Sequence, residues 1–162
     1  MDQSLRIARI IHLALFSGPA MATAVFYFLR QQEALSGQEP IESQPLLVYV
    51  AIAVALLAPV VSHFVATQLG RTAAARVSGD LSMTEVQVAG LYQTVKIVQW
   101  AIIEGGALLQ AVIYFLSGEM TLLALAGLLL AFLAISGPSL ADLQKRLEIS
   151  DSRLRQIQAA SQ

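Results

Sequence analysis

Residues 100–116 read WAIIEGGALLQAVIYFL, a nearly apolar run that contains a single carboxylate, Glu104. With the residues just before it, the run reaches the length of about 20 residues that a helix needs to cross a bilayer. Backbone amides cannot stay unpaired in lipid, so a segment of this kind must be helical. The stretch therefore predicts a membrane-spanning helix with an acid inside it.

Three further apolar stretches have a similar length. The predicted spans are about 10–29, 46–65, 97–116 and 120–139. Of the 162 residues 56% are hydrophobic and 13% are charged, whereas soluble domains carry about 25% charged residues. We therefore predict an all-α fold, a polytopic membrane protein with a four-transmembrane-helix bundle. The transmembrane domain is expected over residues 1–139, and a cytoplasmic amphipathic C-terminal helix or tail over residues 140–162.

The basic residues predict the orientation of the spans. Nine of them lie before the first span, between the second and third, or after the fourth, and only Arg30 lies on the other side. The nine are Arg6, Arg9, Arg71, Arg76, Lys96, Lys145, Arg146, Arg153 and Arg155. The positive-inside rule places both termini in the cytoplasm. The expected location is the cell inner or plasma membrane, with the lipid bilayer as surrounding partner.

The first and third spans are similar to each other. Residues 11–30 and 98–117 are identical at eight of twenty aligned positions, which include a glycine, a tyrosine and a phenylalanine. The pattern predicts two similar helical hairpins in parallel orientation, an internal repeat of the kind found in many transport proteins. Chance similarity between apolar helices is the alternative. In this alignment Ser17 takes the position of Glu104.

Two local patterns predict structure outside the spans. Residues 82–85, SMTE, match a capping box, so the third helix is expected to begin near Met83. After Pro138, apolar residues follow heptad spacing at Leu140, Leu143, Leu147, Leu154 and Ile157. These residues predict an amphipathic helix that docks on a partner, on its own copy or on the membrane surface. A solvated tail is the alternative.

Glu104 is the main candidate for function. It lies eight residues after Lys96, about 12 Å along a helix, and so well inside the predicted hydrocarbon layer. An ionised carboxylate at this depth is costly, so the side chain should be protonated, paired or facing a cavity. One interpretation is a proton- or cation-binding site. The other is a protonated acid that hydrogen-bonds across a helix interface.

Several neighbours are expected to support this acid. Gly105 and Gly106 would let another helix approach closely. The candidate hydrogen-bond partners are Ser17, Thr23, Gln110 and Ser62. No basic residue lies at a matching depth in another span, so a buried salt bridge is not expected.

The run AIIEGGALLQAVIYFL, residues 101–116, resembles the acid-bearing helix of the proteolipid c subunit of rotary F- and V-type ATP synthases. In that family a glutamate followed by glycine or alanine binds the transported proton, and the resemblance implies this role for Glu104. Four-helix V-type relatives arose by duplication and can lose one of their two acids, which is similar to Ser17 standing in place of a second acid here. The resemblance covers this one helix.

The two histidines, His12 and His63, give a different hypothesis. Both are predicted near the cytoplasmic leaflet on neighbouring helices, where two imidazoles could bind haem axially in a haem- or quinone-associated redox subunit. Amphipathic side chains at headgroup level are the other interpretation. No metal site is expected, because no carboxylate lies within helical spacing of either histidine.

Composition and motifs argue against other classes of function. The chain has no cysteine and a net charge of −1, so thiolate chemistry and electrostatic nucleic-acid binding are not expected. Phosphate-loop and hydrolase motifs are missing, so we expect no enzymatic activity. Besides proton binding and redox work, a non-catalytic structural or assembly subunit is the remaining hypothesis. Such a subunit would pack on other membrane subunits or on its own copies.

Overall fold

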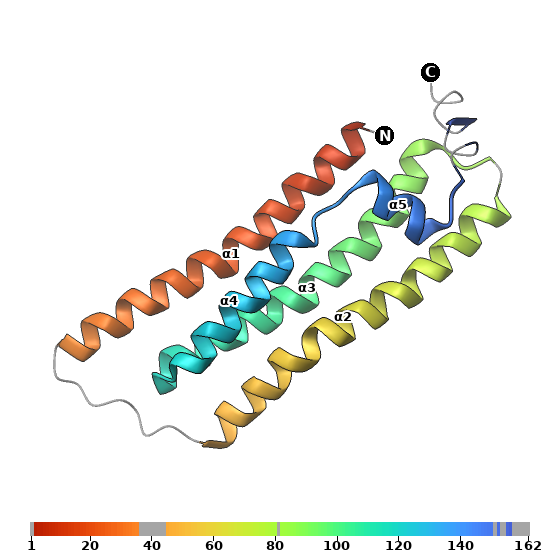
Figure 1. The fold of residues 1–162 in the computed structure, drawn as a ribbon. Helices are drawn as coiled ribbons and strands as arrows, with labels where there is room; N and C mark the ends of the chain where they lie inside the picture. Colours follow the sequence, from red (N-terminus) through yellow and green to blue (C-terminus); the bar gives the residue numbers. More distant parts are fainter. Residues whose placement is uncertain (1, 36–44, 81, 151, 153–154, 157–162) are drawn as a thin grey trace. The chain divides into compact units, whose positions relative to one another are not determined.

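The computed structural model describes residues 2–35, 45–80, 82–150, 152 and 155–156 (Figure 1). The elements within these ranges are α1 (Asp2–Leu35), α2 (Pro45–Gly79), α3 (Glu85–Ser117), α4 (Met120–Ile135) and α5 (Leu140–Leu147). No strand occurs in this part of the chain, which confirms the all-α class. Arg153, which was used to predict the orientation, and the heptad positions Leu154 and Ile157 lie outside the described residues.

Among the described residues, three helices are long and apolar enough to cross a membrane, which indicates a membrane protein. The first is the segment Leu5–Gln32 of α1, and the other two are the whole of α2 and the whole of α3. If α4 and α5 together form one interrupted span, the number rises to four. The predicted fourth span was too long at its end, because α4 stops at Ile135. Pro138 follows closely, and a proline lacks the amide that a continuing helix would need.

The connection expected between the second and third spans is largely helical. α2 continues to Gly79 and α3 begins at Glu85. The α3 cap is made by Thr84 and Gln87: the Thr84 amide donates to Gln87 Oε1 at 2.9 Å, and the Gln87 amide donates to Thr84 Oγ1 at 3.4 Å. The capping box predicted at residues 82–85 is therefore wrong by two positions.

Hydrogen bonds between Ser82 and Asp80 explain why the cap is not at Ser82. The amide and hydroxyl of Ser82 both donate to Asp80 Oδ1, at 2.9 Å and 2.6 Å. An aspartate that accepts from the amide two residues later forms an Asx turn. Ser82 therefore belongs to the turn after α2, and the next hydroxyl residue, Thr84, caps α3.

The chain divides into two compact units, each built from segments of several helices. Unit 1 comprises Met1–Leu13, Ser62–Gln99 and Gly137–Gln162, and unit 2 comprises Ala14–Val61 and Trp100–Ser136. These units are defined by packing. The functional division predicted at residue 139 stays a prediction.

The core of unit 1 holds the C-terminal helix. Leu143 and Leu147 lie one turn apart on α5 and are buried together with Ile149. They pack in one cluster with residues of α2 and α3, namely Ala66, Ala73, Val77, Val88, Tyr92 and Val95. The amphipathic face of α5 thus docks on its own chain.

The core of unit 2 is centred on Trp100. This side chain is fully buried among Ala55, Ile103 and Leu133. Its indole N–H donates to the Ser136 carbonyl at 3.1 Å, at the end of α4. The last carbonyls of a helix have no partner within the helix, so Trp100 satisfies one of them.

Candidate functional site

Glu104 lies on α3 within unit 2, beside α1. Its carboxyl oxygen Oε1 is 3.7 Å from the position that a Cβ on Gly18 would take. The side chain is partly exposed, and Glu104 makes no hydrogen bond or ion pair to any residue in the described part of the chain. This distance corresponds to van der Waals contact between the carboxyl and α1. The acid is therefore close to a second helix, but its carboxyl oxygens make no hydrogen bond to that helix.

The expected hydrogen-bond partners use their polar atoms elsewhere. Ser17 donates to the Ala14 carbonyl at 3.0 Å, and Thr23 donates to the Pro19 carbonyl at 2.7 Å. Ser62 is fully buried on α2, and no hydrogen bond joins it to Glu104 among the described residues. Hydroxyls that bond to their own helix are common in apolar surroundings, where no water satisfies them. Hydrogen bonding of Glu104 across a helix interface has no counterpart among the contacts described in unit 2.

Gln110 crosses to α2 without reaching Glu104. Its amide nitrogen donates to the Ala51 carbonyl at 2.7 Å, and the side chain is fully buried. The amide oxygen Oε1 is buried with no hydrogen-bond partner among the described residues. Gln110 therefore joins α3 to α2 and keeps an acceptor unused.

The two glycines after Glu104 have different surroundings. A Cβ on Gly106 would lie 3.2 Å from the Cβ of Ala58 and 3.3 Å from Cδ1 of Leu129. Gly105 is exposed, and a Cβ there would meet nothing within 4 Å. Of the predicted pair, only Gly106 allows other helices to approach closely in unit 2.

The histidines both belong to unit 1. His63 is exposed on α2 and lines a pocket, and His12 is not among the residues that line it. Within the ranges that the structure describes, no group of three or more His, Cys, Asp or Glu side chains could hold a metal ion. The haem hypothesis stays a prediction.

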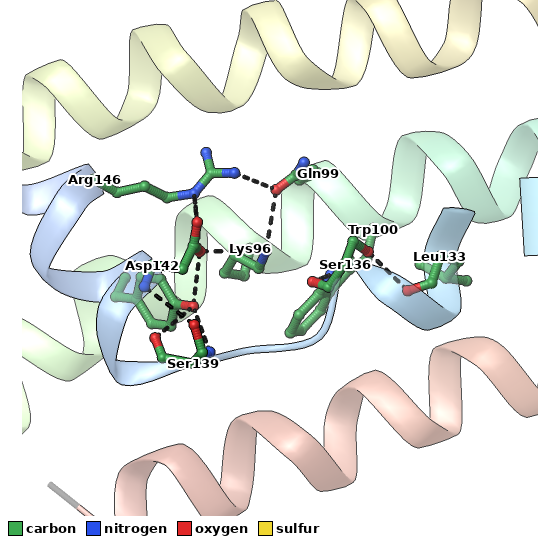
Figure 2. A network of polar contacts seen from close by, with 9 residues as sticks. Lys96, Gln99, Trp100, Leu133, Ser136, Ser139, Asp142 and Arg146 are labelled. Atoms are coloured by element: carbon green, nitrogen blue, oxygen red, sulfur yellow. Dashed lines mark hydrogen bonds and ion pairs between the residues drawn. The ribbon is translucent and has the colours of Figure 1, made fainter. Parts of the chain in front are cut away.

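A buried polar cluster in unit 1, which the sequence interpretation missed, joins α5 to α3 (Figure 2). At its centre is Asp142, whose carboxylate lies 3.4 Å from Lys96 Nζ and 3.0 Å from Arg146 Nε. Tyr92 donates its hydroxyl to the same carboxylate at 2.9 Å. Gln99 Oε1 accepts from Arg146 Nη2 at 3.0 Å and from Lys96 at 3.4 Å.

The cluster is anchored at the start of α5. Ser139 is the N-cap, and its hydroxyl accepts from the Asp142 amide at 3.1 Å. Burial alone would raise the pKa of the Asp142 carboxyl. The positive charges of Lys96 and Arg146 outweigh burial, so the pKa of Asp142 lies below its ordinary value. The carboxylate is therefore ionised at neutral pH and pairs with both cations.

One signal in the sequence could have predicted this cluster. Tyr92, Lys96 and Gln99 follow at spacings of four and three, which places three polar side chains on one face of α3. Asp142 and Arg146 have the same spacing of four on α5. The pairing of these two polar faces depends on tertiary contact between distant segments, which no local pattern contains.

The chain matches no protein-family model, no curated protein and no solved structure.

Proposed function

We propose that the chain is a proton-binding membrane protein in which Glu104 takes up and releases a proton inside the bilayer. The observation that carries this proposal is the position of the acid. Glu104 lies in the apolar segment of α3 beside Gly18, and none of the described residues pairs with it. A carboxyl in such a setting is costly in its ionised form and is most stable with a proton bound. The resemblance of its helix to the acid-bearing helix of the proteolipid c subunit agrees with this role.

The proposed arrangement is four crossings, in a bundle of two helical hairpins, with both termini in the cytoplasm. Nine of the ten basic residues belong to the segments of unit 1, and Arg30 belongs to unit 2. A unit that collects almost all basic residues suits the cytoplasmic face of a membrane. Unit 2 then contains the membrane-embedded part, with Glu104 inside it. The inner or plasma membrane is the proposed location.

Labelling with a hydrophobic carbodiimide tests the proton-binding role of Glu104. Such reagents modify protonated carboxyls that are reached from the lipid phase. In the full chain reconstituted in liposomes, we expect an adduct on the peptide containing Glu104, with a labelling rate that falls as the pH is raised. The adduct is located by mass spectrometry.

Two variants complete this experiment. Glu104→Gln should abolish the adduct, because the amide has the same shape but no acidic proton. Glu119→Gln is the matched control, since Glu119 is exposed in the turn before α4, and it should leave the adduct in place. A wild-type chain that stays unlabelled at every pH would remove the basis for the proposal.

A structural or assembly subunit is the second candidate function, and the exposure of α1 favours it. Only 6% of the residues in the apolar window of α1 are buried within the chain, whereas 44% of those in the apolar window of α3 are buried. Its exposed apolar residues include Leu13, Met21, Val25 and Phe28. A helix with so much uncovered surface is available to another membrane subunit or to a second copy.

Disulfide crosslinking tests packing of α1 against a second copy. The chain has no cysteine of its own, so a single Val25→Cys substitution gives one reactive thiol at a side chain that is 49% exposed. If α1 forms the contact, mild oxidation in membranes gives a crosslinked dimer. Leu128→Cys on α4, at a position 66% exposed, is the control and should stay monomeric. Equal crosslinking of both variants would indicate random collision and argue against a specific contact.

A further inference from the structure

A basic pocket of about 220 Å³ lies in unit 1 between α2 and α5. From α2 it is lined by His63 and Arg71, and from α5 by Lys145 and Arg146. The two helices approach closely beside it, because the space next to Gly70 is taken by the backbone of Arg146, at 3.5 Å from the position of a Cβ. The pocket thus lies beside a contact between α2 and α5 at Gly70.

The charges around this pocket do not balance. The carboxylates among its lining residues are Asp142 and Glu148, and Asp142 already pairs with Lys96 and Arg146. Lys145 and Arg71 are exposed and take no part in these two ion pairs. Counting Lys96, four cationic side chains surround two carboxylates, so the formal excess is two positive charges.

Donors remain available for an anion. Arg146 donates from Nε to Asp142 and from Nη2 to Gln99, and a guanidinium carries more N–H groups than these bonds use. Arginine and lysine side chains that converge on one pocket are the usual partners of phosphate oxygens. A phosphate group would meet Lys145, Arg71 and Arg146 from two helices at once.

The pocket also has the extent along α2 that a lipid headgroup requires. The predicted second span ends near residue 65, so His63 lies at the edge of the hydrocarbon. Arg71 follows eight residues later on α2, about 12 Å further along the helix. The headgroup layer of one leaflet is about 5–8 Å thick. Because about 12 Å exceeds this thickness, the pocket spans the whole headgroup layer of the cytoplasmic leaflet under the proposed topology, including the depth of the lipid phosphates, and Arg71 lies at its cytosolic end.

We propose that this pocket binds a phosphate-bearing anion, held by Arg71 of α2 and by Lys145 and Arg146 of α5. The phosphate belongs to the headgroup of an anionic phospholipid or to a soluble phosphate compound. Basic pockets between membrane helices on the cytoplasmic side bind anionic headgroups in this manner. Because the ligand contacts both helices, its binding also stabilises the docking of α5 on α2.

The test uses the full-length chain purified in detergent. Phosphatidylglycerol, phosphatidylcholine and inorganic phosphate are titrated separately, the last against chloride at equal ionic strength. Binding is measured as the rise in Tm, and retained lipid by native mass spectrometry. Two variants carry the experiment: Arg71→Gln with Lys145→Gln removes both exposed cations of the pocket, and Arg6→Gln with Arg76→Gln removes two exposed cations of unit 1 outside it.

We expect wild type and the Arg6/Arg76 variant to bind phosphatidylglycerol equally, and the Arg71/Lys145 variant to bind it about tenfold to thirtyfold more weakly. The same pattern with inorganic phosphate alone would support the site with a soluble phosphate as ligand. Because all four positions are exposed, the Tm without ligand should be unchanged, which verifies folding. The proposal is overturned if the anionic lipid and phosphate bind no better than phosphatidylcholine, or if both double variants weaken binding equally. Carbodiimide labelling of Glu104 is independent of this result.

Discussion

Replacing Asp142 with asparagine is expected to undock α5 from unit 1. The Lys96 side chain is only 3% exposed, and Asp142 supplies the negative charge beside it. Removing one partner of a buried pair leaves an uncompensated charge and typically costs about 3–5 kcal/mol. Asp142 itself is 28% exposed, so we expect the lower end, about 3 kcal/mol. In native-state hydrogen exchange, the α5 amides should lose about 100-fold in protection.

Two further variants separate the ion pair from other effects. Glu148→Gln makes the same chemical change at an exposed carboxylate just after α5, and it should alter protection by less than about 0.5 kcal/mol. Lys96→Met combined with Asp142→Asn removes both charges, so it should recover much of the lost protection. If Asp142→Asn and Glu148→Gln have equal effects, the cluster does not hold α5 in place.

The membrane-spanning helices could be predicted because apolar length is a local property. Four stretches of apolar residues predicted helices where α1, α2, α3 and α4 occur. The end of the fourth was misjudged, because the apolar character continues past Ile135 while the chain leaves the helix. Hydropathy measures the preference of side chains for lipid, whereas the end of α4 depends on the backbone hydrogen-bonding groups near Pro138.

The helical part of unit 1 was harder to predict. Residues 66–79 are rich in alanine and carry basic residues, so they lack the strong apolar signal of a span. The buried positions Ala66, Ala73 and Val77 nevertheless fall at helical spacing. A search for a small-residue face would have extended α2. Small side chains suit this region because α5 packs closely on it, as it does at Gly70.

The candidate site was predicted in part. The sequence drew attention to Glu104 because an acid in an apolar helix is unusual, and the structure describes it as partly exposed and without a described partner. The side chains around Glu104 could not be predicted, because they depend on how each helix is rotated about its own axis. Ser17 precedes Gly18, which lies against Glu104, yet the Ser17 hydroxyl bonds to its own helix.

Replacing Gly106 with leucine is expected to destabilise unit 2, whereas the same change at Gly105 should not. At Gly106 even a Cβ would lie 3.2 Å from the Cβ of Ala58 on α2 and 3.3 Å from Leu129 on α4. The Ala58 Cβ moves only with its backbone, so a leucine must push α2 away. Overpacking of this kind costs about 1–3 kcal/mol and sometimes more. We expect the larger value and a Tm lower by about 10 °C.

Gly105→Leu is a control of identical chemistry one residue away. A Cβ at Gly105 meets nothing within 4 Å, and leucine favours the helix by nearly 1 kcal/mol over glycine. Its Tm should therefore stay the same or rise, whereas the Tm of Gly106→Leu should fall. Thermal unfolding in detergent measures both. If the two variants lower the Tm equally, α3 does not meet α2 and α4 at Gly106, and the rotation of α3 that turns Glu104 toward Gly18 is wrong as well.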